Sequence, residues 1–314
     1  MITLHRLTKR FGQKLAVDDL TVEIEPGRVT GFLGPNGAGK STTLRMIVGL
    51  DHPTSGRALI RGRRYEDFDR PLTEVGALLD AKALHPGRSA LNHLKAMARS
   101  NGIAESRVGQ VLDEVGLQDA ARRRAGTFSL GMSQRLGIAG ALLGDPGVLL
   151  FDEPVNGLDP DGVRWVRRLA RKLAAEGRTV LVSSHLMSEM QLTADHLIVL
   201  GRGRLLMDAP VREVVAGAGG GRVQIRVPNR RDLNAIGRRL LQESLSVRRM
   251  GDDCLLVEGA TAGELGDLAY AMDIRIHQLK TIEASLEEAY MALTGDSLEF
   301  VAGADHIDRT GEVQ

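Results

Sequence analysis

Three things are scarce in this chain of 314 residues: cysteine, an excess of charge of one sign, and long apolar runs. The single cysteine, Cys254, excludes an intrachain disulfide and is typical of a reducing compartment. Lys and Arg number 41 and Asp and Glu 40, and this balance argues against a nucleic-acid partner. The best charge-free apolar stretch, Leu136–Gly144, has about half of the roughly 18 residues that a membrane-spanning helix needs. We therefore expect a cytoplasmic chain that reaches a membrane only through a partner.

The apolar pattern divides the chain into two unequal domains, the number that its length suggests. Over residues 1–215, apolar runs typical of strands, such as Val29–Leu33 and Thr73–Leu79, alternate with helical periodicity. This order predicts an α/β domain with a mainly parallel sheet covered by helices. The glycine-rich Ala216–Gly221 is the predicted linker. Residues 222–296 have the order β-α-β-β-α-β, which predicts a small α+β domain of the split βαβ type, and residues 297–314 are expected to be a disordered tail.

A glycine-rich loop between a predicted buried strand and a predicted helix is the most specific motif. It fits G-x-x-x-x-G-K-[ST] with the run Gly34-Pro35-Asn36-Gly37-Ala38-Gly39-Lys40-Ser41. In such a loop, consecutive backbone N–H groups and the helix N-terminus surround a phosphate. We expect Lys40 to reach the β- and γ-phosphates and Ser41 to hold Mg²⁺, with Thr42 as a further nucleotide contact. The motif therefore predicts a site for a nucleoside triphosphate.

Two carboxylates follow the apolar run Val148–Phe151. A carboxylate at the end of a strand beside the phosphate loop can bind Mg²⁺ through water, which suits Asp152. A second carboxylate beside it can polarise the attacking water, which suits Glu153. Together with the phosphate loop, this pair predicts that the nucleoside triphosphate is hydrolysed.

A second anion site is predicted just upstream, at the start of a helix. The run there is Phe128-Ser129-Leu130-Gly131-Met132-Ser133-Gln134-Arg135. A hydroxyl, an unhindered glycine N–H and a helix N-terminus together favour an anion. The ordered set of phosphate loop, helical insert, Ser-x-Gly-x-x-Gln-Arg, Asp-Glu, Gly157-Leu158-Asp159 and His185 resembles the ATP-binding subunit of ATP-binding-cassette (ABC) transporters.

The resemblance covers roughly residues 1–216. It implies a P-loop NTPase cassette, in which a mainly parallel sheet with antiparallel strands carries a helical subdomain, here at about residues 81–145. The C-terminal part is similar to that of drug- and antibiotic-resistance exporters, where a short regulatory or dimerisation domain follows the cassette. That likeness includes a closing helix at Ser285–Gly295.

The resemblance also implies roles for individual residues, with ATP and Mg²⁺ as the ligands. Phe11 matches an aromatic residue that stacks on adenine. Ser129 and Gly131 match the signature that contacts the γ-phosphate of ATP held by the other subunit. Asp159 matches an aspartate that crosses the dimer interface, and His185 matches a switch histidine that contacts the γ-phosphate and the attacking water. Catalysis would then fall to Glu153, His185 and Lys40.

Two positions depart from the family pattern. Asp80 stands where the family usually has glutamine, after the apolar run Val75–Leu79, so it would reach Mg²⁺ through water or respond mainly to the membrane partner. Leu130 and Met132 replace a usual glycine and a usual glutamine in the signature. Because Leu130 adds bulk near a tight interface, we expect slow ATP hydrolysis.

The resemblance implies a homodimer in the ATP-bound state and separate transmembrane permease subunits. The helical subdomain, with Asp80 at its entrance, would dock on the permease at the inner face of the membrane. Export of a drug, an antibiotic or a lipid-like molecule is the favoured function. An importer ATPase, and a cassette protein acting on ribosomes or DNA, are the alternatives. The C-terminal module and Asp80 favour the exporter, and the single phosphate loop argues against a ribosome-acting relative.

Overall fold

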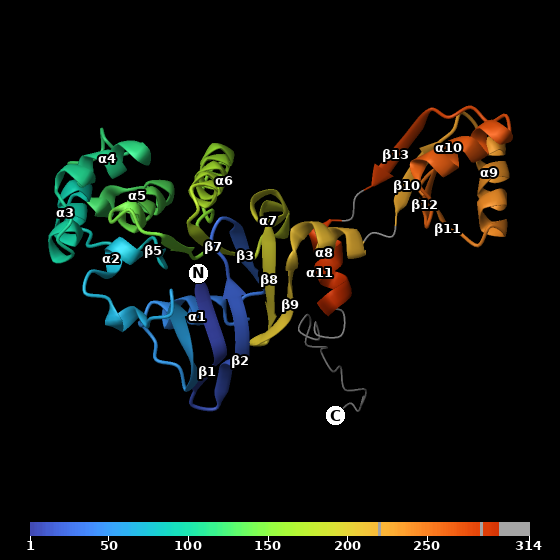
Figure 1. The fold of residues 1–314 in the computed structure, drawn as a ribbon. Coiled ribbons are helices and arrows are strands. Elements are labelled where there is room, and N and C mark those ends of the chain that lie inside the picture. The colour runs from blue at the N-terminus through green and yellow to red at the C-terminus, as the bar shows by residue number, and fades with distance from the viewer. Residues whose placement is uncertain (219–220, 283–284, 295–314) are drawn as a thin grey trace, which may run out of the picture.

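The computed structural model describes residues 1–218, 221–282 and 285–294, which form three sheets and the helices around them (Figure 1). The strands are β1 Ile2–Phe11, β2 Lys14–Ile24, β3 Val29–Leu33, β4 Ser55–Ile60, β5 Val75–Leu78, β6 Val148–Phe151, β7 Thr179–Ser184, β8 His196–Gly201, β9 Arg204–Pro210, β10 Arg222–Arg226, β11 Ser246–Arg249, β12 Cys254–Glu258 and β13 Gln278–Ile282. The helices are α1 Lys40–Ile47, α2 Pro71–Glu74, α3 Ala90–Ser100, α4 Ser106–Glu114, α5 Leu130–Leu142, α6 Pro160–Ala175, α7 Met187–Thr193, α8 Val211–Ala218, α9 Arg230–Gln242, α10 Ala262–Ala271 and α11 Leu286–Thr294.

The central sheet has six strands in the order β5-β6-β7-β3-β8-β9. Its first five strands are parallel and β9 is antiparallel to β8, so the predicted mainly parallel sheet is confirmed. Every residue of β3 is buried, as expected of an apolar run in a strand that is covered on both faces. The strands β6, β7 and β3 are neighbours, and parallel strands end at the same edge of a sheet. The loops that follow these three strands therefore meet at one place.

A second, antiparallel sheet of β2, β1 and β4 lies beside α1 (Figure 1). Alternate side chains of β1 and β2, among them Ile2, Leu4 and Val22, are buried in one cluster with Leu44 and Ile47 of α1. This period of two is what a strand with one covered face requires. The packing fixes α1, and with it the end of the phosphate loop, against the central sheet.

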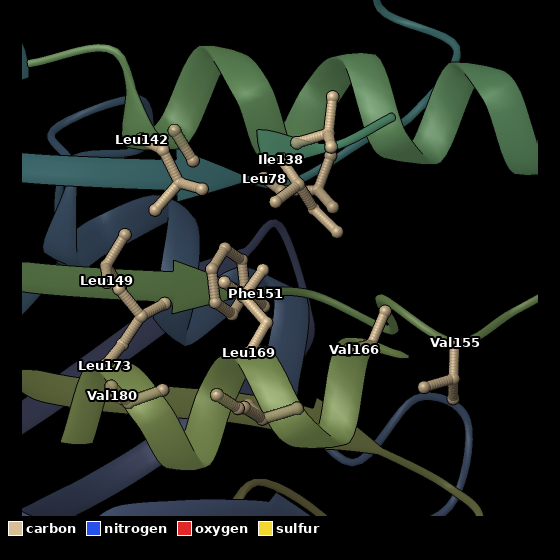
Figure 2. Close-up of a cluster of buried hydrophobic side chains, with 14 of the residues drawn as sticks. Leu78, Ile138, Leu142, Leu149, Phe151, Val155, Val166, Leu169, Leu173 and Val180 are labelled. Atoms are coloured by element: carbon tan, nitrogen blue, oxygen red, sulfur yellow. The ribbon is translucent and has the colours of Figure 1, made fainter. Parts of the chain in front are cut away.

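The helical subdomain consists of α3, α4 and α5, and α5 lies against β5 and β6 (Figure 2). In Figure 2, Ile138 and Leu142 of α5 and Leu169 of α6 point toward Phe151 of β6 from opposite sides. A Cβ at Gly76 of β5 would lie 1.9 Å from the Ala141 carbonyl oxygen, so only glycine permits this close approach.

Two local predictions differ from the structure. The sequence favoured a strand over Thr73–Leu79, but Pro71–Glu74 form the short helix α2 and the strand begins at Val75. A proline at the first helical position favours that turn. The predicted linker was Ala216–Gly221, but Ala216–Ala218 belong to the last turn of α8. The predicted tail at residues 297–314 lies outside the described residues.

The C-terminal residues form a four-stranded antiparallel sheet in the order β11-β12-β10-β13, with α9 and α10 packed against it. That is the strand order of the split βαβ pattern. The last helix, α11, returns to the first domain and packs on α7 and α8 (Figure 1). No helix within the described ranges is both long enough and apolar enough to cross a membrane.

Candidate functional site

The ends of three neighbouring strands bring the predicted site residues together. The loop 34–41 follows β3, Asp152 and Glu153 follow β6, and His185 follows β7. Helix α1 begins at Lys40, so its N-terminus opens onto the loop. Gly39 precedes it with φ +103°, and a Cβ there would lie 2.6 Å from the Ala16 carbonyl oxygen. Both facts require glycine at this position, which explains its place in the motif.

The Lys40 ammonium lies inside the phosphate loop, and its side chain is only 6% exposed. Its Nζ donates hydrogen bonds to the carbonyl oxygens of Gly34, at 2.6 Å, and Pro35, at 3.4 Å. The Glu153 Oε1 lies 3.6 Å from the same Nζ. A buried ammonium needs such partners. The positive charge therefore stands between the loop and the Glu153 carboxylate, where the terminal phosphate of a bound nucleotide would meet both.

Glu153 is held through both its backbone and its side chain. Its φ is +48°, in the left-handed region that non-glycine residues rarely adopt. Its N–H donates to the Ser183 Oγ at 2.9 Å, and the Ser183 hydroxyl donates to the Asp152 carboxylate. Its Oε2 lies 2.9 Å from the His185 Nδ1. The structure thus brings Lys40, Glu153 and His185 into one chain of contacts.

A cavity of about 240 Å³ opens beside the phosphate loop. It is lined by Phe11, Lys14, Ala16, Pro35, Asn36, Gly37, Ala38, Gly39, Lys40, Ser41, Thr42 and Glu153. Phe11 is 49% exposed, so it is a wall of this cavity rather than part of the core. The Lys9 Nζ lies 4.9 Å from the centre of its ring. The sequence did not single out Lys14; it lies at the start of β2, and only the pairing of β1 with β2 reveals its position.

Ser129 and Asp159 each cap a helix. The Ser129 Oγ accepts a hydrogen bond from the Met132 N–H at the start of α5, and the Asp159 Oδ1 accepts one from the Gly162 N–H at the start of α6. Both residues are exposed, and neither they nor Gly131 line the phosphate-loop cavity of their own chain. Their hydroxyl and carboxylate are therefore available to a second molecule.

Asp80 lies just after β5, close to the end of the neighbouring strand β6. The two strand ends are joined by a hydrogen bond that the Asp152 N–H donates to the Leu78 carbonyl oxygen. The Asp80 Oδ1 accepts a hydrogen bond from the Lys82 N–H at 2.8 Å, so this carboxylate also shapes the turn that enters the helical subdomain. Asp80 is exposed and does not line the phosphate-loop cavity.

Gln134 contacts the site, although no role for it follows from the sequence alone. It is 3% exposed, and its Nε2 donates to the Glu153 carbonyl oxygen at 3.1 Å. The signal was present as the Gln-Arg pair of the Ser-x-Gly-x-x-Gln-Arg run, but nothing in the sequence places this amide beside Glu153.

Comparison with known proteins places the chain in a family. The model of the ABC transporter family matches residues 17–156, and residues 221–287 match a family described only as a domain of unknown function. An uncharacterized ABC transporter ATP-binding protein of Bacillus subtilis, YhcH, is 36% identical over 97% of this chain and 99% of its own length. The bacitracin transport ATP-binding protein BcrA of Bacillus licheniformis is 42% identical over 65% of this chain and 68% of its own length.

A solved structure of similar fold is a dimeric ATP-binding cassette in a post-hydrolysis state, bound to ADP and Pi. It is 26% identical, with a TM-score of 0.62 over 68% of this chain and 99% of the other. The fold and the site thus define a P-loop ATP hydrolase of the cassette type. The chain belongs to the ABC transporter ATP-binding proteins: it is the subunit of a transporter that binds and hydrolyses ATP.

Proposed function

We propose that two copies of this chain close head to tail around two ATP molecules and drive export of an antibiotic-like or lipid-like compound through separate permease subunits. The observation that carries the proposal is the division of the site. The phosphate loop, Glu153 and His185 meet in one chain, whereas Ser129 and Asp159 cap helices outside that cavity. A second copy would supply its own Ser129 and Gly131 to the γ-phosphate.

Within one site, each residue has a role that follows from its position. Lys40 stabilises the charge that develops on the γ-phosphate, because its ammonium already lies inside the loop. Glu153 accepts a proton from the attacking water, and His185 orients the Glu153 carboxylate through their 2.9 Å contact. Phe11 offers its exposed ring to adenine at the mouth of the cavity.

The donor set beside the loop fits Mg²⁺, which prefers hydroxyl, carboxylate and water oxygens. Ser41 lines the cavity, and Asp152 is fixed by the Ser183 hydroxyl. Asp80, at the end of the adjacent strand β5, would act through water. When bound, the ion neutralises charge on the β- and γ-phosphates.

The export assignment is supported by relatives whose names state their cargo, including the bacitracin transport protein. The helical subdomain, residues 81–145, would dock on the permease, which would place the chain at the cytoplasmic face of the membrane. The test is a pull-down of the tagged chain from detergent-solubilised membranes of its host. A stoichiometric multi-helix membrane protein is the expected result, and ribosomal proteins or DNA without it would overturn the assignment.

Hydrolysis and dimer formation are tested by Glu153→Gln, with Lys40→Ala as the matched control. The Glu153→Gln variant should bind Mg·ATP, lose turnover by at least 100-fold, and stay dimeric in light scattering because the ATP sandwich cannot be broken. Lys40→Ala should bind ATP weakly by calorimetry and stay monomeric. A Glu153→Gln protein that remains monomeric at saturating Mg·ATP would refute the head-to-tail arrangement.

A further inference from the structure

The Gln134 side chain is a buried polar group whose amide reaches across from the signature helix to the site. It lies on α5, three residues after Gly131, so both residues are on one face of the helix. Its Nε2 donates to the Glu153 carbonyl oxygen at 3.1 Å. A buried amide without a partner would be destabilising, so this contact is a specific one. It joins the helix that carries Ser129 and Gly131 to the residue that activates water.

Glu153 needs such a contact because its backbone conformation is unfavourable. With φ at +48°, it occupies the left-handed region, which is sterically unfavourable for a residue that has a Cβ. Ser183 fixes its N–H at 2.9 Å and Gln134 fixes its carbonyl oxygen. Without the second contact, the Glu153 backbone would be held only at its N–H, and its carboxylate would be positioned less firmly against Lys40 and His185.

Two further side chains of α5 contact the segment that follows Glu153. Leu130 covers Gly157, since a Cβ at Gly157 would lie 2.1 Å from the Leu130 Cδ2. The Arg135 guanidinium lies 4.4 Å from the centre of the Trp165 ring on α6, and its Nη1 donates to the Val115 carbonyl oxygen at 2.9 Å. The α5 N-terminus is thus in contact with the neighbouring segment, and through Gln134 with Glu153.

We propose that Gln134 is a positioning residue that sets the Glu153 backbone according to the position of α5. In the dimer, α5 of one chain contacts the ATP of the other, so Gln134 would make hydrolysis at one site depend on engagement of the second ATP. The inference rests on the proposed function, because it takes Glu153 as the general base and Ser129 and Gly131 as contacts to the partner's nucleotide.

The test is Gln134→Met in the full-length chain, which keeps the length and burial of the side chain but removes the amide donor. Turnover at saturating Mg·ATP should fall about tenfold, the change expected when one hydrogen bond is lost from the transition state. The KM for ATP should stay within about twofold of the unaltered protein, since no nucleotide contact is removed. Gln134→Asn keeps an amide but is one methylene too short, and should give the same split between kcat and KM.

The matched control is Ile138→Val, a loss of packing one turn further along α5, where Ile138 faces the core (Figure 2). This control should lower thermal stability while kcat at 25 °C stays unchanged. The sole tryptophan, Trp165, also reports on α5 through its contact with Arg135, and its fluorescence should respond equally to Mg·ATP in Gln134→Met and the unaltered protein.

Three outcomes distinguish a positioning role of Gln134 from a failure of the proposed function. A kcat that is lowered at unchanged KM in both Gln134 variants, but not in the control, supports a positioning role. An unchanged kcat in Gln134→Met, with Glu153→Gln inactive, overturns the inference alone and leaves the proposed function standing. Turnover in Glu153→Gln at the rate of the unaltered protein would instead overturn the proposed function.

Discussion

The leucine at the start of α5 and the glycine that it covers illustrate how single residues shape this site. Leu130 replaces the glycine that the family resemblance implies, and its bulk near a tight interface is the reason that we expect slow ATP hydrolysis. The structure shows its side chain lying over Gly157 of the same chain, where a Cβ would be 2.1 Å from the Leu130 Cδ2. Gly157 itself has φ +71°. The Leu130 side chain therefore packs against residue 157, where both the close contact and the positive φ require glycine.

We predict that Gly157→Ala lowers both stability and ATP hydrolysis, because it adds a clash to an unfavourable φ. The loss should exceed 1 kcal/mol by chemical denaturation. Leu130→Ala in the same chain removes the clash and should restore all but the roughly 1 kcal/mol cost of the left-handed alanine. Equal losses in the single and double variants would show that Leu130 does not restrict this position.

At the scale of elements, an ion pair joins α11 to the C-terminal sheet. The Arg222 guanidinium at the start of β10 binds both carboxylate oxygens of Glu288 on α11, one of them at 3.0 Å. These hydrogen bonds, with that from the Ser285 N–H, lower the pKa of Glu288 from 4.5 to about 2. The carboxylate therefore stabilises the fold above pH 4.5, and this contribution is lost as the pH falls toward 2.

Replacement of this carboxylate should have a pH-dependent effect on stability. Glu288→Gln should lower the free energy of unfolding at pH 7 by about 1 kcal/mol, because the side chain is 49% exposed and solvent screens the pair. Urea denaturation should show this difference shrinking between pH 4.5 and pH 2. Glu287→Gln, an exposed neighbour, serves as the control. A difference between Glu288→Gln and the unaltered protein that is constant from pH 7 to pH 2 would contradict the assignment.

Elements with a strong period or a special turn could be predicted from the sequence, and those set by tertiary contacts could not. The buried run Val29–Leu33 and the glycines of the loop 34–41 carried enough information to place β3 and the phosphate site. The secondary structure of Thr73–Leu79 is ambiguous in the sequence, because a run of about four apolar residues fits either a short strand or one turn of a helix. The Glu153 contacts with Gln134 and Ser183 depend on strand order, which local pattern does not encode.

At the scale of the molecule, the chain leaves the first domain after α8 and returns to it with α11 (Figure 1). Leu286, Ala289 and Tyr290 of α11 are buried in the same cluster as Val214 of α8. The Leu286 N–H also donates to the Gln191 Oε1 on α7 at 3.0 Å. Since α7 begins two residues after His185, the helix α11 supports the element that follows this histidine.

This arrangement separates two roles that a simple truncation would confuse. Removal of all residues after 218 uncovers the apolar faces of α7 and α8. Burial of the Leu286 and Tyr290 side chains contributes roughly 4 kcal/mol, so the melting temperature should fall by about 10 °C.

Replacement of residues 222–282 by a flexible Gly/Ser linker of about ten residues keeps α11 and should leave the melting temperature within a few degrees of that of the unaltered protein. The second variant then tests the C-terminal sheet itself. If that sheet stabilises the dimer or contacts the permease, ATP-dependent dimerisation or recovery of the permease should weaken although the cassette is intact. Unaltered dimerisation and recovery in a stable variant of this kind would rule out both roles and leave support of α7 as the function of the C-terminal helix.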